Sequence, residues 1–132
     1  MAYCSGQIRY LAAIRELSET EDEVKCVSIA RHLGISRAGV SKMLRCMANS
    51  GLVYEDFGSN VVLTPEGIKA AEEIYRSYKD IYVFFRNILK LPHDEAHDQA
   101  LLFITEFPKE TSDRLRRVVR NSIKRKNNKK DT

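Results

Sequence analysis

Two histidines, His93 and His97, stand four residues apart in the segment HDEAH. Side chains at this spacing share one face of a helix, where two imidazoles could bind a transition metal, with Asp94 or Asp98 as a further ligand. The second position of the segment is Asp rather than the Glu of zinc peptidases, and no third ligand follows downstream. A relocated metal site, a zinc hydrolase and a histidine pair without special function all stay open, and we expect no enzyme.

A second group of residues that could take part in binding is cationic. Residues 27–53 contain no acid, although residues 19–23 just before them are acidic. The cations of this segment are Arg31, Arg37, Lys42 and Arg45. Residues 114–132 hold nine Lys or Arg and one acid, a net charge of +8 in a chain of net charge +4. Such basic blocks suit a phosphate-facing surface, although a solvated positive face has the same composition.

The elements that position the first basic block are two short helices. Ser28 is predicted to cap a helix over 29–33, and Gly34 suits the left-handed residue after it. Ser36 is predicted to cap a second helix that runs to about Asn49. Two strands, 52–54 and 61–63, are predicted to flank a turn over 56–60. A helix, a turn, a second helix and a hairpin make a winged helix-turn-helix, whose second helix enters the DNA major groove.

We therefore expect double-stranded DNA as a partner. Arg37 and Lys42 are the candidates for reading guanine, and Ser36 and Ser41 for donating to phosphates. The predicted DNA-binding residues are Ser36, Arg37, Ala38, Gly39, Ser41, Lys42, Arg45, Gly58, Ser59 and Asn60. A winged helix that binds protein remains an alternative. RNA binding also remains possible, although the sequence lacks the exposed aromatic platform expected for single strands.

Helical periodicity dominates the rest of the chain. Thr64, Pro65 and Glu66 begin a long helix over 65–90, and two further helices follow Pro92 and Pro108. The predicted fold is mostly α. A winged helix-turn-helix DNA-binding domain (1–64) precedes an all-helical dimerisation domain (65–123) and a basic flexible tail (124–132), which adds phosphate contacts or solubility. The apolar stripes of the second domain need partners, so we expect a homodimer.

Composition agrees with a small globular protein. The chain has 132 residues, of which 43% are hydrophobic and 30% charged. It contains neither an apolar run long enough for a membrane span nor a visible signal peptide, so we expect a cytoplasmic protein with no membrane partner. Cys4, Cys26 and Cys46 have no disulfide or metal-knuckle spacing, and Cys26 beside Lys25 leaves a redox switch open.

Several motifs within residues 8–118 resemble those of a single protein family. They are Tyr10–Leu11 with Ile14, IARHLGISRAGVSKML, SGLV, LTPEG and FFRNILKLPHDEAHDQA. With them the sequence resembles the diphtheria-toxin-repressor and manganese-transport-regulator family of metal-dependent bacterial regulators, in its short form without the extra C-terminal domain. The resemblance implies a homodimer that reads a palindromic operator. It also implies repression of metal-uptake genes when a divalent metal, Mn or Fe, is bound.

The resemblance also places the family's metal ligands on this sequence. His97 keeps a ligand type, whereas the histidine and glutamate of the linker helix fall on Tyr78 and Tyr82. The position before the Tyr–Leu pair is Arg9. The remaining ligand positions fall on Ala12, Leu101, Ile104 and Thr105. Because Ala, Leu and Ile offer no donor to Mn²⁺ or Fe²⁺, we expect that the metal switch does not operate at the inherited position.

Two interpretations of the substituted site stay open. Arg9, Tyr78, Tyr82 and His97 could hold a small anionic or aromatic effector, or the two tyrosines could simply fill the core. The predicted function is a sequence-specific transcriptional regulator, a repressor, similar to the manganese and iron regulators. The alternative is a metal-independent regulator that responds to another small ligand.

Overall fold

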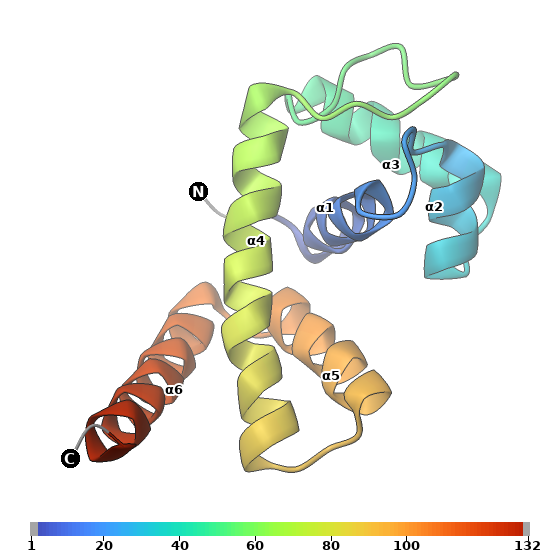
Figure 1. The fold of residues 1–132 in the computed structure, drawn as a ribbon. Helices are drawn as coiled ribbons and strands as arrows, with labels where there is room; N and C mark the ends of the chain where they lie inside the picture. The colour runs from blue at the N-terminus through green and yellow to red at the C-terminus, as the bar shows by residue number, and fades with distance from the viewer. Residues whose placement is uncertain (1–2, 131–132) are drawn as a thin grey trace. The chain divides into compact units, whose positions relative to one another are not determined.

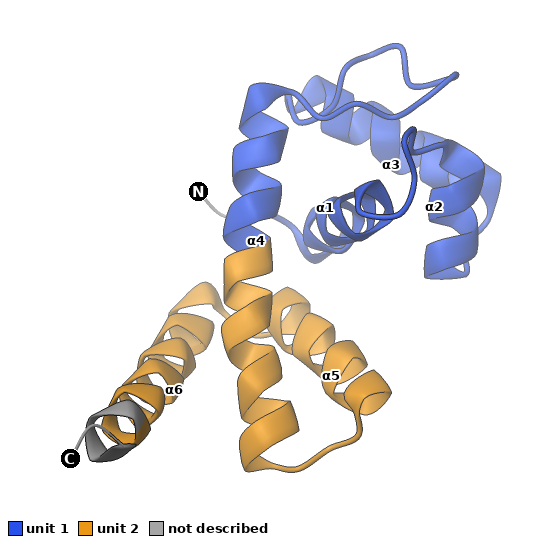
Figure 2. Cartoon of the chain, in the orientation of Figure 1, with its two compact units in different colours: residues 1, 3–74 blue, residues 2, 75–132 orange. Residues whose placement is uncertain are grey.

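A computed structural model describes residues 3–130, with side chains for residues 3–126. Its helices are α1 (Ser5–Ser18), α2 (Cys26–Leu33), α3 (Arg37–Asn49), α4 (Pro65–Val83), the π-helical η1 (Phe84–Ile88), α5 (His93–Glu106) and α6 (Lys109–Lys130) (Figure 1). Two compact units, Tyr3–Ile74 and Tyr75–Thr132, divide within α4 (Figure 2). Within the described residues, no helix is long and apolar enough to cross a membrane. The domain boundary expected after residue 64 remains a prediction.

The first unit is built on α1, α2 and α3, which pack on one another around an apolar core (Figure 1). The largest fully buried side chains of this core are Leu11, Ile29, Val40, Leu44, Met47 and Val53. Three of them, Val40, Leu44 and Met47, recur along α3 at steps of three and four, which gives that helix one buried face. The buried face fixes the orientation of α3 in the unit and leaves its opposite face to solvent.

The turn between α2 and α3 follows the sequence prediction, but the start of α2 does not. Gly34 has the left-handed φ of 67°, and the Ser36 hydroxyl accepts a hydrogen bond from the Gly39 backbone N–H at 3.1 Å. However, α2 begins at Cys26 after Lys25, so the prediction that Ser28 caps it is wrong. The Ser28 N–H already donates to the Lys25 carbonyl at 3.0 Å, which adds a turn before the predicted start.

The segment after α3 forms a wing, residues 52–63, without the predicted strands. A single antiparallel bridge joins Val53 to Leu63, and no strand occurs in residues 3–130. Two bonds bracket this pair: the Tyr54 N–H donates to the Val62 carbonyl, and the Thr64 N–H donates to the Leu52 carbonyl. The paired runs are too short to extend the ladder, and the residues between them favour turns.

The start of α4 is held tightly against the base of the wing. The Thr64 hydroxyl accepts from the Gly67 N–H at 3.0 Å and donates to the Gly51 carbonyl at 2.6 Å. A Cβ atom on Gly67 would lie only 2.0 Å from the Leu52 carbonyl oxygen. Glycine at position 67 therefore permits a backbone approach that no other residue allows.

The second unit contains the rest of α4 with η1, α5 and α6. Ile81, Ala96, Ala100 and Val119 are fully or almost fully buried. The helix predicted over 65–90 is α-helical only to Val83 and then widens into η1, where the Leu89 N–H donates to the Phe84 carbonyl. Lys90, at φ 63°, ends the run before Pro92.

The basic C-terminal segment is helical where a flexible tail is expected. Helix α6 continues to Lys130, and residues 131–132 lie outside the described part of the chain. Residues 109–130 contain no glycine or proline, and lysine and arginine are good helix formers. Nothing in this segment therefore stops the helix. In the middle of α6, Arg116 and Arg120 both contact the Asp80 carboxylate, at 2.9 and 3.1 Å, and join α6 to α4.

Candidate nucleic-acid interface

The exposed face of α3 carries most of the predicted DNA-binding residues. Arg37, Ala38, Lys42 and Arg45 are exposed, and Ser41 is half-buried. Ser36 caps the helix, and a Cβ on Gly39 would stand 3.3 Å from the Ser36 hydroxyl oxygen, so a small residue at position 39 leaves the cap undisturbed. The structure thus brings the predicted residues of α3 together on one accessible surface, which we call the α3 face.

The cations of the α3 face have no acidic partners among the side chains that the structure describes. Arg37, Lys42 and Arg45 form no ion pair there. By contrast, Arg15, Arg116 and Arg120 all contact carboxylates. The positive potential of the α3 face is therefore not neutralised within the unit, and the helix N-terminus adds partial positive charge. This surface is chemically suited to an anionic partner.

The α3 face is positioned from behind by α1. Tyr10 is buried, and its hydroxyl donates to the Gly39 carbonyl at 3.5 Å. Burial raises the pKa of the Tyr10 hydroxyl, which therefore remains a neutral donor. Sequence patterns alone do not reveal this contact because it joins residues 29 positions apart, although an aromatic side chain with a polar tip on the apolar stripe of a helix is a signal for it.

The tip of the wing supplies the remaining predicted residues. Gly58 and Ser59 are exposed, and Asn60 is half-buried. The wing is anchored on its returning side, where the Val61 N–H donates to the Val24 carbonyl at 2.6 Å. The tip therefore stands out from a segment that is held in place. Because the α3 face and the wing tip belong to one compact unit, they can contact a single partner.

The two histidines of the HDEAH segment each contact a tyrosine. His93 Nδ1 lies 2.6 Å from the Tyr82 hydroxyl, and the His97 ring packs edge-on against Tyr78 with centroids 5.4 Å apart. His97 Nδ1 also lies 3.2 Å from a carboxylate oxygen of Asp98. No group of three or more His, Cys, Asp or Glu side chains suited to a metal occurs in the described residues. Neither the relocated metal site nor the zinc hydrolase thus gains a third ligand there.

The positions to which the resemblance assigns metal ligands do not fit Mn²⁺ or Fe²⁺. Ala12 and Ile104 are buried and apolar, and the Thr105 hydroxyl donates to the Leu102 carbonyl at 3.0 Å. Tyr78 and Tyr82 pack against each other, with ring centroids 5.8 Å apart. This donor set lacks the carboxylates that hard divalent cations need. Of the proposed effector residues, Tyr78, Tyr82 and His97 lie together in the second unit, whereas Arg9 belongs to the first.

The cysteines differ in accessibility. Cys4 and Cys46 are exposed, whereas Cys26 is half-buried with its thiol 3.5 Å from the Phe57 carbonyl oxygen. Burial raises the pKa of the Cys26 thiol, against the smaller opposing effects of a backbone hydrogen bond and of Arg37. A raised pKa lowers the thiolate fraction, so this environment does not support the redox switch considered for Cys26.

Two family descriptions match most of the chain. Residues 8–56 match the iron-dependent repressor, N-terminal DNA-binding domain, and residues 64–129 match the iron-dependent repressor, metal-binding and dimerisation domain. The transcriptional regulator MntR of Salmonella typhimurium is 38% identical over 64 residues, which are 48% of this chain and 41% of that protein.

Two solved structures share the fold. The manganese regulator SloR superposes with a TM-score of 0.72 at 28% identity, over 91% of this chain and 55% of that one. A manganese-dependent transcriptional repressor in complex with manganese has a TM-score of 0.74 at 27% identity, over 86% of this chain and 52% of that one. The chain thus spans about half the length of these relatives.

Proposed function

The chain belongs to the iron-dependent repressor family, also known as the diphtheria-toxin-repressor and manganese-transport-regulator family, and from this premise we propose that it is a sequence-specific, DNA-binding transcriptional repressor. The observation that carries the proposal is the α3 face, with three exposed cations and no acidic partner for them among the described side chains. Arg37 and Lys42 read guanine in the major groove, while Arg45, Ser36 and Ser41 contact phosphates. Gly58, Ser59 and Asn60 contact the adjacent backbone or minor groove. The expected cytoplasmic location follows only from this function.

We further propose that the repressor acts as a homodimer. Six large apolar side chains of the second unit are exposed among the described residues of the single chain: Ile88, Leu89, Leu102, Phe107, Val118 and Ile123. Exposed apolar surface of this kind is removed from water when a second copy covers it. Two copies related by a two-fold axis present two α3 faces, so the operator is an inverted repeat whose half-sites are one or more helical turns apart.

The proposal does not include a divalent metal at the inherited ligand positions. The phenols of Tyr78 and Tyr82 contact the histidines, and the buried positions are apolar. The DNA-binding state that manganese-dependent relatives reach with manganese is therefore reached by this chain without the metal, either constitutively or through another small ligand.

Recovery of bound sequences from a pool of random duplexes tests the proposed function. The full chain should retain DNA in chelator and enrich an inverted repeat, with the same sequence recovered after addition of Mn²⁺, Fe²⁺ or Zn²⁺. Retention that requires one of these metals would contradict the metal-independent part. Absence of retention even at low salt would contradict DNA binding itself and favour a protein-binding winged helix.

A further inference from the structure

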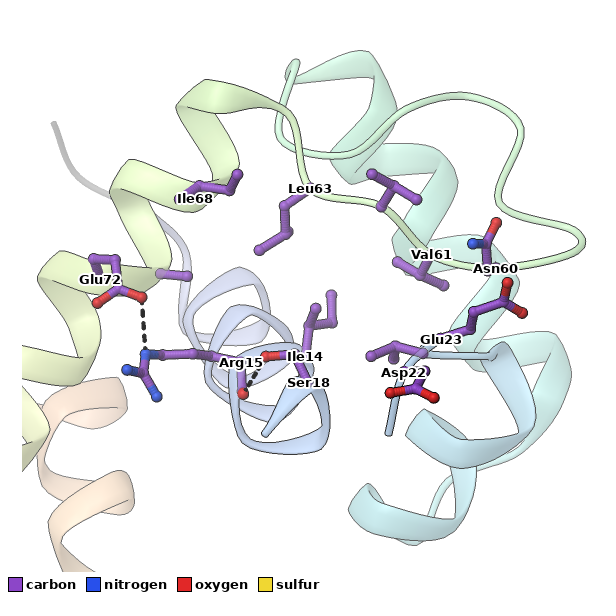
Figure 3. A pocket seen from close by; sticks show the side chains of 13 residues that line it. Ile14, Arg15, Ser18, Asp22, Glu23, Asn60, Val61, Leu63, Ile68 and Glu72 are labelled. Carbon is purple, nitrogen blue, oxygen red and sulfur yellow. Dashed lines mark hydrogen bonds and ion pairs between the residues drawn. The ribbon is translucent and has the colours of Figure 1, made fainter. Parts of the chain in front are cut away.

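A cavity of about 360 Å³ opens in the first unit, and none of its lining residues belongs to α3. Its walls come from the end of α1, the loop before α2, the returning side of the wing and the first turns of α4 (Figure 3). Ile14 and Leu63 lie on two of these walls and face the hollow. The volume is within the range of small-molecule sites. Because two stretches that are far apart in the sequence, residues 14–24 and 60–72, form it together, no local spacing could reveal it.

The wall of the cavity is apolar and partly exposed to water. Ile14, Val61 and Ala71 are buried lining residues. Val62 and Ile68 also line it, yet 45% of Val62 and 52% of Ile68 remain exposed. An apolar ligand that enters the cavity would remove these exposed aliphatic side chains from water, which is favourable.

The rim of the cavity carries an excess of negative charge. Arg15 and Glu72 stand at one end and bind each other at 3.0 Å, while Asp22 and Glu23 stand at the other (Figure 3). Asp22 and Glu23 are exposed and form no ion pair with any described side chain. The base at this rim is thus already paired, whereas two acids are not, and the potential at the mouth favours a cation.

We propose that this cavity is a regulatory site for a small organic cation, a protonated amine on an aliphatic or aromatic body. The apolar part covers Val62 and Ile68, and the ammonium group lies beside Asp22 and Glu23. A ligand of this class has an apolar body that matches the apolar walls and a positive charge that matches the acidic rim. A neutral hydrophobe would leave both acids uncompensated, and an anion would be repelled by them.

The position of the cavity gives its occupant a route to the DNA-binding surface. Asn60 lines the cavity and is also a predicted contact of the wing tip, and Val61 beside it is tied to Val24, another lining residue. A bound amine would hold the returning side of the wing and neutralise acids that repel phosphates. This part rests on the proposed function, and it predicts about twofold to fivefold tighter DNA binding, the range of one surface ion pair.

Amide NMR titration of the full chain with phenethylamine, and with phenethyl alcohol as the neutral match, tests the site. The amine should give saturable shifts at Val24, Val61 and Ala71, with affinity about threefold to tenfold above that of the alcohol. Glu23→Gln should weaken the amine about twofold to fivefold and leave the alcohol unchanged. Glu21→Gln, which removes an acid from the same loop outside the cavity, should change neither.

Equal affinity for amine and alcohol, shifts elsewhere in the unit, or equal effects of the two substitutions would overturn the site. DNA affinity is measured separately by fluorescence anisotropy, with and without the amine. If the amine binds at the cavity and DNA affinity does not change, the regulatory role is overturned. If the chain binds no DNA under any condition, the proposed function fails, while the NMR result still decides whether the site exists.

Discussion

The Tyr82 hydroxyl lies 2.6 Å from Nδ1 of His93 and joins α4 to α5 within the second unit. One helical turn away, Tyr78 packs edge-on against His97. Both tyrosines and both histidines are four residues apart, so two antiparallel helices present two matched tyrosine–histidine pairs. The resemblance places metal ligands at Tyr78, Tyr82 and His97. Aromatic packing and a hydrogen bond thus occupy the positions to which the resemblance assigns metal ligands.

Loss of the Tyr82 hydroxyl should destabilise the second unit. In Tyr82→Phe the ring contact remains but the hydrogen bond to His93 is lost, and the free energy of unfolding should fall by about 0.5–1.5 kcal/mol. Urea denaturation followed by circular dichroism measures this change. Tyr54→Phe is the matched control, because Tyr54 is exposed and its hydroxyl forms no hydrogen bond with any described residue. Equal stability changes in the two variants would argue against the role of the contact.

Divalent metals should not stabilise the fold. A metal that binds only the folded chain raises stability by mass action, by about 2.7 kcal/mol at a hundredfold excess over its dissociation constant. The described residues hold no group of three suitable ligands, so Mn²⁺ and a chelator should give the same melting temperature. A rise in melting temperature with Mn²⁺ that disappears in His97→Ala would show instead that a metal site operates in the second unit.

Gly67 should tolerate no side chain. In Gly67→Ala the new Cβ would clash with the Leu52 carbonyl oxygen, so α4 must move away from the wing. Overpacking of this kind costs about 1–3 kcal/mol or more, and we expect the upper end because the opposing atom is backbone. Thermal unfolding is the measurement. Gly58→Ala, at an open position of the wing tip, should melt like the parent chain. If Gly67→Ala had the same melting temperature as Gly58→Ala, the close approach of the Gly67 and Leu52 backbones would be contradicted.

The three thiols should react with iodoacetamide at different rates. Cys4 and Cys46 are exposed, whereas burial raises the pKa of the Cys26 thiol. A raised pKa means that the thiolate of Cys26 forms only at higher pH, so its alkylation should lag from neutral to mildly alkaline solution. Peptide mass spectrometry after timed quenching gives the three rates. Reaction of Cys26 ahead of both others at neutral pH would reverse this account and restore the redox switch.

Local signals in the sequence predict well the helices and turns that carry the α3 face. Ser36, Gly34 and Thr64 each act through bonds within a few residues of themselves, and the structure confirms all three roles. The buried stripe of α3 likewise follows from helical periodicity alone, and with it the exposure of Arg37 and Lys42. Their contact with DNA stays a prediction.

Contacts between distant segments could not be predicted in the same way. The pairing of Tyr82 with His93 depends on how α4 packs on α5, and the cavity depends on two separate stretches of the chain. The predicted strands are absent because apolar runs of only three residues, 52–54 and 61–63, do not determine how many ladder bonds form. The helical course of residues 124–130 does not follow from composition, because a high density of charge predicts a flexible tail although each residue type permits a helix.

The central claim, that the α3 face binds DNA, is tested most directly by the salt dependence of binding to the selected operator. Fluorescence anisotropy should show that Arg45→Ala weakens binding and lowers the slope of log K against log salt by about 2, one phosphate contact from each subunit. Arg37→Ala should cost about 1–3 kcal/mol per half-site and relax the sequence preference. Arg76→Ala, an exposed cation of α4, should leave affinity and slope unchanged. If all three variants bind like the parent chain with the same slope, the α3 face is not the DNA-binding surface.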